Sequence, residues 1–128
     1  MRFEDDFMLR QLKQLVELVA AALRLKQPED EERAQAEIDD LYRRLLNMDR
    51  TLFETLDAAS VARLLGDADR ALHVALVMHA EAQLWESQGE QARARRRGQR
   101  ALRLLEGLTL PREHASLREE LEALVDRL

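Results

Sequence analysis

Apolar residues recur every three or four positions along most of the chain, the spacing that places them on one face of an α-helix. The first such stretch runs from Glu4 to about Lys26 and ends before Pro28, which disfavours helix in the preceding residue and suits the first turn of a new helix. The second stretch opens with the acidic run 29–32, at the positive end of a helix dipole, and continues to about Met48. The pattern therefore predicts two long helices at the start of the chain.

The apolar pattern shortens between residues 49 and 66. Thr51-Leu52-Phe53 is interpreted as a linking turn, and Asp57 is expected to cap a brief helix that Gly66 ends. The remaining predicted helices span about 67–88, 90–106 and 111–128. We therefore expect an all-α fold of antiparallel helical hairpins, a bundle of five long helices and one short helix.

Composition favours helices over sheets and removes several kinds of chemistry. Leu, Ala and Arg make up almost half of the 128 residues, whereas Val, Ile and Thr together supply 10. The absence of Cys excludes disulfides, Cys-ligated zinc and thiol nucleophiles, and the four Gly form no glycine-rich phosphate loop. We expect a single helical domain over residues 1–128, with one hydrophobic core and no cofactor.

Charge and targeting signals favour a cytoplasmic protein. The formal net charge is −5, so the surface as a whole repels nucleic acid and anionic lipid. The N-terminus is acidic where a secretory signal would be basic. The longest apolar stretch, residues 15–25, includes Glu17 and Arg24 and is well short of the roughly 20 residues needed to cross a bilayer. We therefore expect no membrane contact.

Small residues and one tryptophan occupy regular positions in the two helices expected at about 69–106. These positions are Ala82, Trp85, Gly89, Ala94, Gly98, Ala101 and Leu102. With this spacing, residues 75–106 resemble one tetratricopeptide repeat, a helix pair of about 34 residues. The resemblance implies close approach of the two helices at the small residues, a turn at Gly89, and a C-terminal capping helix at about 111–128. Glu81, Gly98 and Glu106 depart from the repeat pattern, which usually has Leu, an aromatic residue and Pro there.

The start of the chain carries a second resemblance. Residues 3–12, Phe-Glu-Asp-Asp-Phe-Met-Leu-Arg-Gln-Leu, are followed by an apolar helix and then by an acidic one. This arrangement is similar to a bacterial family of small helical proteins without an assigned function, which is also repeat-like toward its C-terminus. The similarity implies an all-helical fold and no particular activity.

An arginine cluster lies in the helix expected at 90–106, a segment with no acidic residue between its two ends. At about 100° per residue, five of the arginines fall within an arc of roughly 120°. This candidate anion or partner face consists of Arg93, Arg96, Arg97, Arg100 and Arg103. The opposite arc is apolar and contains Ala94, Gly98 and Ala101, so the helix is two-faced.

Three interpretations of the arginine face remain open. The first is a solvated face neutralised by acids of neighbouring helices. The second is a site for an anion or an acidic partner, and the third is a site for nucleic acid. The helix contains no aromatic residue on which bases could stack, so nucleic acid is the least favoured partner.

The sequence shows no metal or catalytic motif. His73, His79 and His114 lack the Glu three residues earlier that di-iron helical bundles use, so we expect structural or exposed histidines. The 25 acidic residues are interpreted as helix-end and solvated groups, and the aromatic residues as packing. The predicted function is a non-catalytic protein-interaction module that also self-associates as a homodimer. The alternatives are a regulatory module that binds an anionic ligand or nucleic acid through the arginine face, and an enzyme whose carboxylates assemble only in three dimensions.

Overall fold

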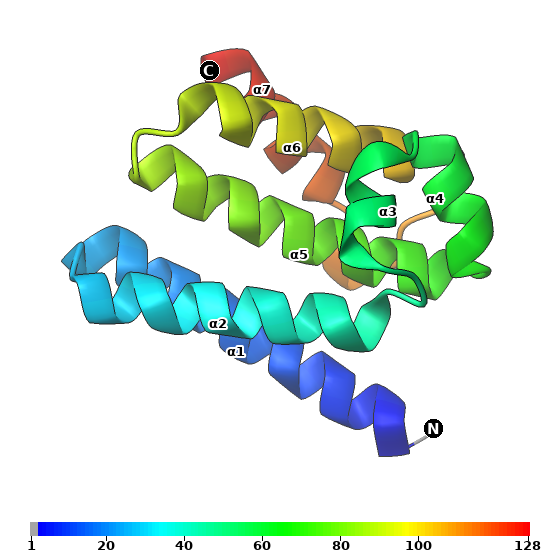
Figure 1. The fold of residues 1–128 in the computed structure, drawn as a ribbon, viewed down its shortest axis with the longest axis horizontal. Coiled ribbons are helices and arrows are strands. Elements are labelled where there is room, and N and C mark those ends of the chain that lie inside the picture. Colours follow the sequence, from blue (N-terminus) through cyan, green and yellow to red (C-terminus); the bar gives the residue numbers. More distant parts are fainter. Residues whose placement is uncertain (1–2) are drawn as a thin grey trace.

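Seven α-helices and one 3₁₀ turn form the regular structure of residues 3–128 in the computed structural model (Figure 1). The structure describes residues 3–128, and their side chains from Asp6 onward. In chain order the elements are α1 (Phe3–Leu25), α2 (Pro28–Leu45), α3 (Arg50–Thr55), α4 (Ala58–Leu65), α5 (Ala68–Ser87), α6 (Gln91–Leu104), η1 (Arg112–His114) and α7 (Leu117–Arg127). Residues 3–128 contain no β-strand, which confirms the all-α prediction.

The segment after α2 differs from the sequence prediction, because residues 51–53 lie in helix α3 and do not form a linking turn. The backbone N–H of Phe53 donates to the carbonyl of Asp49 at 3.0 Å. The Phe53 side chain is fully buried, with its ring centroid 5.5 Å from that of Tyr42. A six-residue helix is not stable alone, so tertiary packing produces it and the periodic pattern could not predict it. The chain therefore has two short helices where one was expected.

The start and end of α4 confirm the prediction made from Asp57 and Gly66. The Asp57 carboxylate accepts a hydrogen bond from the backbone N–H of Ser60 at 2.8 Å, and Gly66 ends the helix with a φ of 91°. Asp67 then caps α5 in the same way, accepting from the backbone N–H of Arg70 at 2.7 Å. These two caps fix where the chain turns into the central helix.

The last helix is shorter than predicted, since α7 begins at Leu117 and not near residue 111. Between α6 and α7 the chain forms a turn that contains η1. The Arg118 guanidinium donates to the carbonyl of Leu105 at 2.7 Å and also to that of Leu108. A side chain of α7 thus satisfies carbonyl groups that follow the end of α6. Such long-range contacts carry no helical periodicity, which is why the sequence placed the boundary too early.

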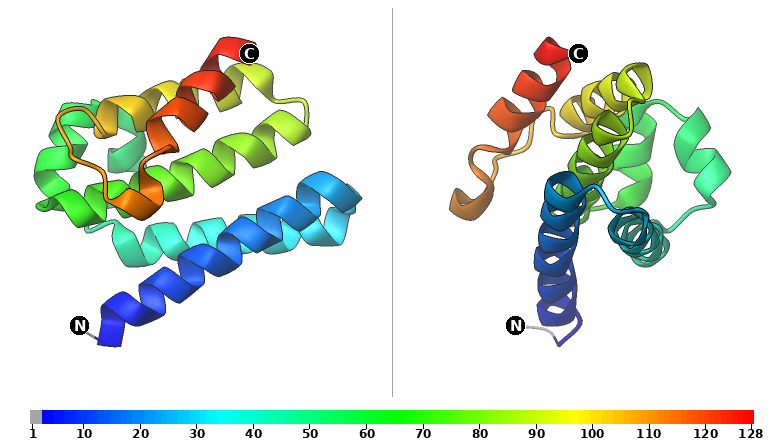
Figure 2. Two further views of the ribbon diagram at one scale, coloured as in Figure 1. Left: turned by 180° about the vertical axis from the view of Figure 1, so that it is seen from behind. Right: turned by 90° about the vertical axis from the view of Figure 1, so that its left-hand side faces the viewer.

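Helix α5 lies at the centre of the molecule and contacts α1, α2, α4, α6 and α7. The antiparallel hairpin α1–α2 packs along α5, while α3 and α7 lie on opposite sides of the α5–α6 pair (Figures 1 and 2). Because protein surrounds α5, its apolar residues are buried on several faces. Glu81 lies in the middle of this helix and is fully buried.

Five of the seven predicted repeat residues of the α5–α6 pair are buried. Ala82, Ala94 and Ala101 are fully buried. Trp85 is buried too, Leu102 is half-buried, and Gly89 forms the turn with a φ of 82°. Gly98 differs from the expectation of a contact within the pair. A Cβ at Gly98 would lie 3.0 Å from Val125 Cγ2 and 3.1 Å from Leu124 Cδ2, so its small size admits α7.

Candidate functional site

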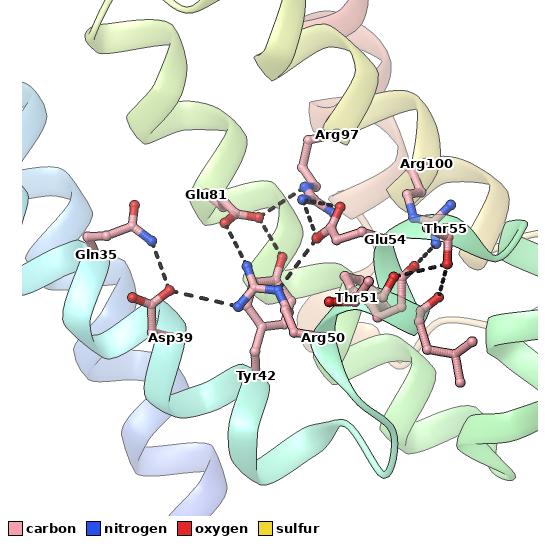
Figure 3. Close-up of polar contacts among 12 residues, drawn as sticks. Gln35, Asp39, Tyr42, Arg50, Thr51, Glu54, Thr55, Glu81, Arg97 and Arg100 are labelled. Atoms are coloured by element: carbon pink, nitrogen blue, oxygen red, sulfur yellow. Dashed lines mark hydrogen bonds and ion pairs between the residues drawn. The ribbon is translucent and has the colours of Figure 1, made fainter.

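An open groove of about 710 Å³ lies between α2, α3, α5 and α6. Figure 3 shows several of its polar side chains, which come from all four helices. The lining residues are Gln35, Asp39, Arg50, Glu54, Glu81, Trp85, Arg93, Arg96, Arg97 and Arg100. Five arginines face three carboxylates, so the groove is net positive in a protein whose formal net charge is −5.

Glu81 is surrounded by three donors inside this groove. Its Oε1 accepts a hydrogen bond from the Tyr42 hydroxyl at 2.6 Å. Arg97 Nε lies 3.0 Å from the same oxygen, and Arg50 Nη2 lies 3.5 Å from Oε2. A buried carboxylate is tolerated only when donors compensate it, and these residues from α2, α3 and α6 do so.

Burial controls the protonation of this cluster. Desolvation raises the pKa of Glu81 above its ordinary value, and the opposing effects of Arg97, Tyr42 and Arg50 only reduce the shift. Burial, reinforced by the neighbouring Glu81, also raises the pKa of Tyr42 well above its ordinary value. Tyr42 therefore keeps its proton, and its hydroxyl donates a hydrogen bond to Glu81.

Arg97 is buried, with 6% of its side chain exposed, so the interpretation of a solvated face does not hold at this residue, although acids of neighbouring helices do neutralise it. Its Nη2 donates to both oxygens of Glu54, at 2.7 and 3.0 Å. Its Nε is close enough to Glu81 for an ion pair but is not aligned for a hydrogen bond, and its buried Nη1 has no hydrogen-bond partner in residues 3–128. The guanidinium thus retains unused donor capacity beside the groove.

The other arginines of the predicted face differ from Arg97. Arg100 is half-buried and donates to the carbonyl of Phe53. Arg93 is exposed and stacks on Trp85, with its Cζ 3.9 Å from the ring centroid. Arg96 and Arg103 are exposed, and neither has an ion pair within the described side chains. The five arginines of the predicted face therefore divide into two that contact the protein interior, Arg97 and Arg100, and three that are exposed, Arg93, Arg96 and Arg103.

A second hollow continues the groove along α6. It shares Arg96 and Arg100 with the first hollow and adds Arg103, and its acidic side chains are those of Asp57 and Glu106. The basic surface therefore extends over several turns of α6. Such an extended shape suits a chain segment better than a single small anion.

Glu81 lines the groove but is enclosed by its own partners. Its carboxylate is fully buried and is engaged by Tyr42, Arg97 and Arg50. The groove therefore holds a buried negative charge beside its arginines.

The described histidines and acids form no metal cluster. No group of three or more His, Asp or Glu in the described part of the chain is arranged to hold a metal ion. His79 Nδ1 lies 3.9 Å from a carboxylate oxygen of Glu120, and burial lowers the pKa of His79. This contact lies at a different hollow, between α1, α5 and α7.

Sequence reasoning found the arginines but missed Glu81, Tyr42 and Glu54 as their partners. One signal was present, because Glu81 interrupts an otherwise apolar stretch of a long helix. It was interpreted only as a departure from the repeat pattern. Glu54 carried no signal, since its helix was not predicted.

No protein-family model, curated protein or solved structure matches the chain. The two resemblances seen in the sequence therefore stay predictions.

Proposed function

We propose that the protein is a non-catalytic interaction module whose groove binds an acidic segment of a partner protein. The observation that carries the proposal is the pair Arg93 and Arg96, which line the groove beside Trp85 and have no carboxylate partner in the described side chains. Arg97 and Arg50, in contrast, are balanced internally by Glu81 and Glu54. Unpaired guanidinium groups beside an aromatic ring favour carboxylate ligands.

A protein segment suits the groove better than nucleic acid. Asp39 and Glu54 line its walls and would repel a phosphate backbone. Arg93 covers one face of the Trp85 ring, so a base cannot stack on that face. Carboxylates spaced along a flexible peptide can place their charges between these acids. The tetratricopeptide resemblance implies the same class of partner.

A labelled hexaglutamate peptide tests this proposal by fluorescence anisotropy. We expect saturable binding at about 50 mM salt that weakens at about 200 mM, because exposed charges are screened. The double change Arg93→Gln and Arg96→Gln is expected to weaken binding about tenfold, since each exposed pair contributes up to roughly 1 kcal/mol. Wild type and variant are expected to melt at similar temperatures.

The matched control changes two exposed arginines outside the groove, Arg95→Gln and Arg112→Gln. It lowers the net charge by the same amount, so equal weakening by both double variants would contradict a groove-specific site. A single-stranded oligonucleotide of equal charge that competes better than hexaglutamate would assign the groove to nucleic acid.

Self-association through α1 is a second proposed property. Phe7, Leu9, Val16 and Leu25 of this helix are exposed apolar residues, and Val16 is 64% exposed. No helix in residues 3–128 combines the length and apolar character needed to cross a membrane. We propose that a protein surface covers these exposed apolar residues.

A second copy of the chain complements this surface. Leu9 and Val16 border an apolar hollow of about 720 Å³ between α1, α5 and α7. Lys13 lies on its α1 side, and Glu113 and Glu120 lie on the other side. In a two-fold pair, Lys13 of each copy faces the acidic side of its partner, so the surface is complementary to itself.

Light scattering after size exclusion tests the homodimer. We expect twice the 14.8 kDa monomer mass at micromolar concentration, and the monomer mass for Val16→Glu, which places a charge in the apolar contact. Leu64→Glu, an equally polar change at an exposed residue of α4, should leave the dimer intact. A wild-type mass of 14.8 kDa throughout would end the proposal.

A further inference from the structure

The groove holds a carboxylate that belongs to the protein itself. Glu54 of α3 receives two hydrogen bonds from Nη2 of Arg97, at 2.7 and 3.0 Å, and its Oε1 lies 3.5 Å from Nε of Arg50. Its side chain is 39% exposed, whereas that of Arg97 is 6% exposed. Glu54 therefore sits at the solvent side of a buried guanidinium, where an acidic ligand would make the same contact (Figure 3).

We propose that Glu54 is an internal competitor of the acidic ligand. In the empty groove it occupies the subsite formed by Arg97 and Arg50, and it leaves when a carboxylate of the partner enters. The inference rests on the proposed function, because it concerns the same groove. It makes Glu54 the residue that sets how tightly the groove binds acidic segments.

The exchange conserves the charge balance of the groove. When Glu54 leaves, the ligand carboxylate replaces it at Arg97, and Glu81 stays paired with the same guanidinium. The released Glu54 is already partly in water, so its full solvation requires little rearrangement. Neither state leaves a buried charge without a partner, which is the condition for two interchangeable arrangements.

The location of Glu54 suits a displaceable group. Helix α3 has six residues, and Phe53, the residue next to Glu54, anchors it. The Phe53 side chain is buried, and its carbonyl accepts a hydrogen bond from Arg100. Glu54 can therefore rotate away while Phe53 keeps α3 in place. A carboxylate on a long, enclosed helix such as α5 has no such freedom, as Glu81 illustrates.

Two charge-neutralising variants distinguish occupation of the Arg97 subsite by Glu54 from a general effect of the groove charge on binding. Glu54→Gln and Asp39→Asn each remove one negative charge from the groove wall, but Asp39 contacts Gln35 at 3.0 Å and Arg50 at 3.8 Å and does not contact Arg97. With labelled hexaglutamate at about 50 mM salt, we expect Glu54→Gln to bind about tenfold more tightly than wild type and Asp39→Asn about two- to threefold more tightly. Circular dichroism first establishes that both variants are folded.

A further variant keeps the negative charge at position 54 but moves it away from Arg97. Glu54→Asp shortens the side chain by one methylene, so the contact with Arg97 is lost while the groove charge is unchanged. We expect tighter binding than wild type here as well, and Asp39→Glu as the matched control is expected to bind like wild type. Melting curves supply an independent reading: Glu54→Gln should gain more stability from saturating peptide than Asp39→Asn gains.

Each outcome has a separate meaning. Equal affinities for Glu54→Gln and Asp39→Asn would show that only net charge matters and would overturn the competitor role, while the proposed function stands. Weaker binding by Glu54→Gln would overturn it too, because Glu54 would then assist the ligand. Failure of hexaglutamate to bind wild type and every variant would reject the proposed function, and the competitor role with it.

Discussion

Arg97→Met is expected to lower the free energy of unfolding by about 3–5 kcal/mol, the range for breaking a buried ion pair by removing one partner. The variant keeps much of the side-chain volume but leaves the carboxylate of Glu81 fully buried without its nearest guanidinium. Glu54, which is partly exposed, loses its hydrogen bonds to Arg97 but can turn to water. Urea denaturation followed by circular dichroism measures the change.

A double variant adds Glu81→Gln to Arg97→Met. The neutral amide still accepts the hydrogen bond from Tyr42, so no buried hydroxyl is left unpaired. We expect this double variant to recover most of the lost stability, because no uncompensated charge remains inside. A loss below about 1 kcal/mol for Arg97→Met alone would contradict the described ion pair.

The pH dependence of Arg97→Met has a definite sign. Burial already raises the pKa of Glu81, and removal of Arg97 takes away the largest opposing effect, so this pKa rises further in the variant. The folded variant then binds a proton that the unfolded chain releases above about pH 4.3, and its stability falls as the pH rises. The difference in stability from wild type should therefore be larger at neutral pH than near pH 4.

Phe53→Ala is the second large effect, with an expected loss of about 3–5 kcal/mol, the range for large aromatic residues in a core. The Phe53 ring is fully buried and lies 5.5 Å from that of Tyr42, and Arg100 lies over it at 5.2 Å. Without this anchor α3 is too short to persist, so Arg50 and Glu54 would leave the groove.

The neighbouring residue supplies the control for Phe53→Ala. Leu52 lies on the same helix and is 42% exposed, so Leu52→Ala should change stability by less than about 0.5 kcal/mol. Similar losses for both variants in urea denaturation would mean that α3 does not depend on the burial of Phe53. Protection of the α3 amide protons against exchange should fall only in Phe53→Ala.

The long helices could be predicted because their apolar spacing extends over many turns. Leu15 and Ile38 follow that spacing and are buried as expected. Helix α3 could not be predicted, because six residues contain less than two turns of pattern and Phe53 is held by contacts with distant residues. Helix α7 begins at Leu117, and the contact from Arg118 to the preceding turn sets this boundary. No local feature of the sequence indicates it.

The site could be predicted only in part. The apolar face of α6 was placed correctly, since Ala94, Gly98 and Ala101 are buried. At about 100° per residue, Arg97 stands at the edge of the arginine arc, next to the direction of Ala101. A residue at such an edge becomes buried or exposed according to which helix packs beside it. Here α3 and Glu81 enclose it, and neither contact is local in sequence.

The single tryptophan gives the most direct test of the proposed groove. Trp85 lines the groove and carries the guanidinium of Arg93 on its ring, so its fluorescence reports a ligand that engages that arginine. Titration of unlabelled hexaglutamate into wild-type protein at about 50 mM salt should produce a saturable change in Trp85 emission that weakens at about 200 mM and is reduced by Arg93→Gln with Arg96→Gln. Unchanged Trp85 emission across the titration would contradict an acidic segment bound in this groove.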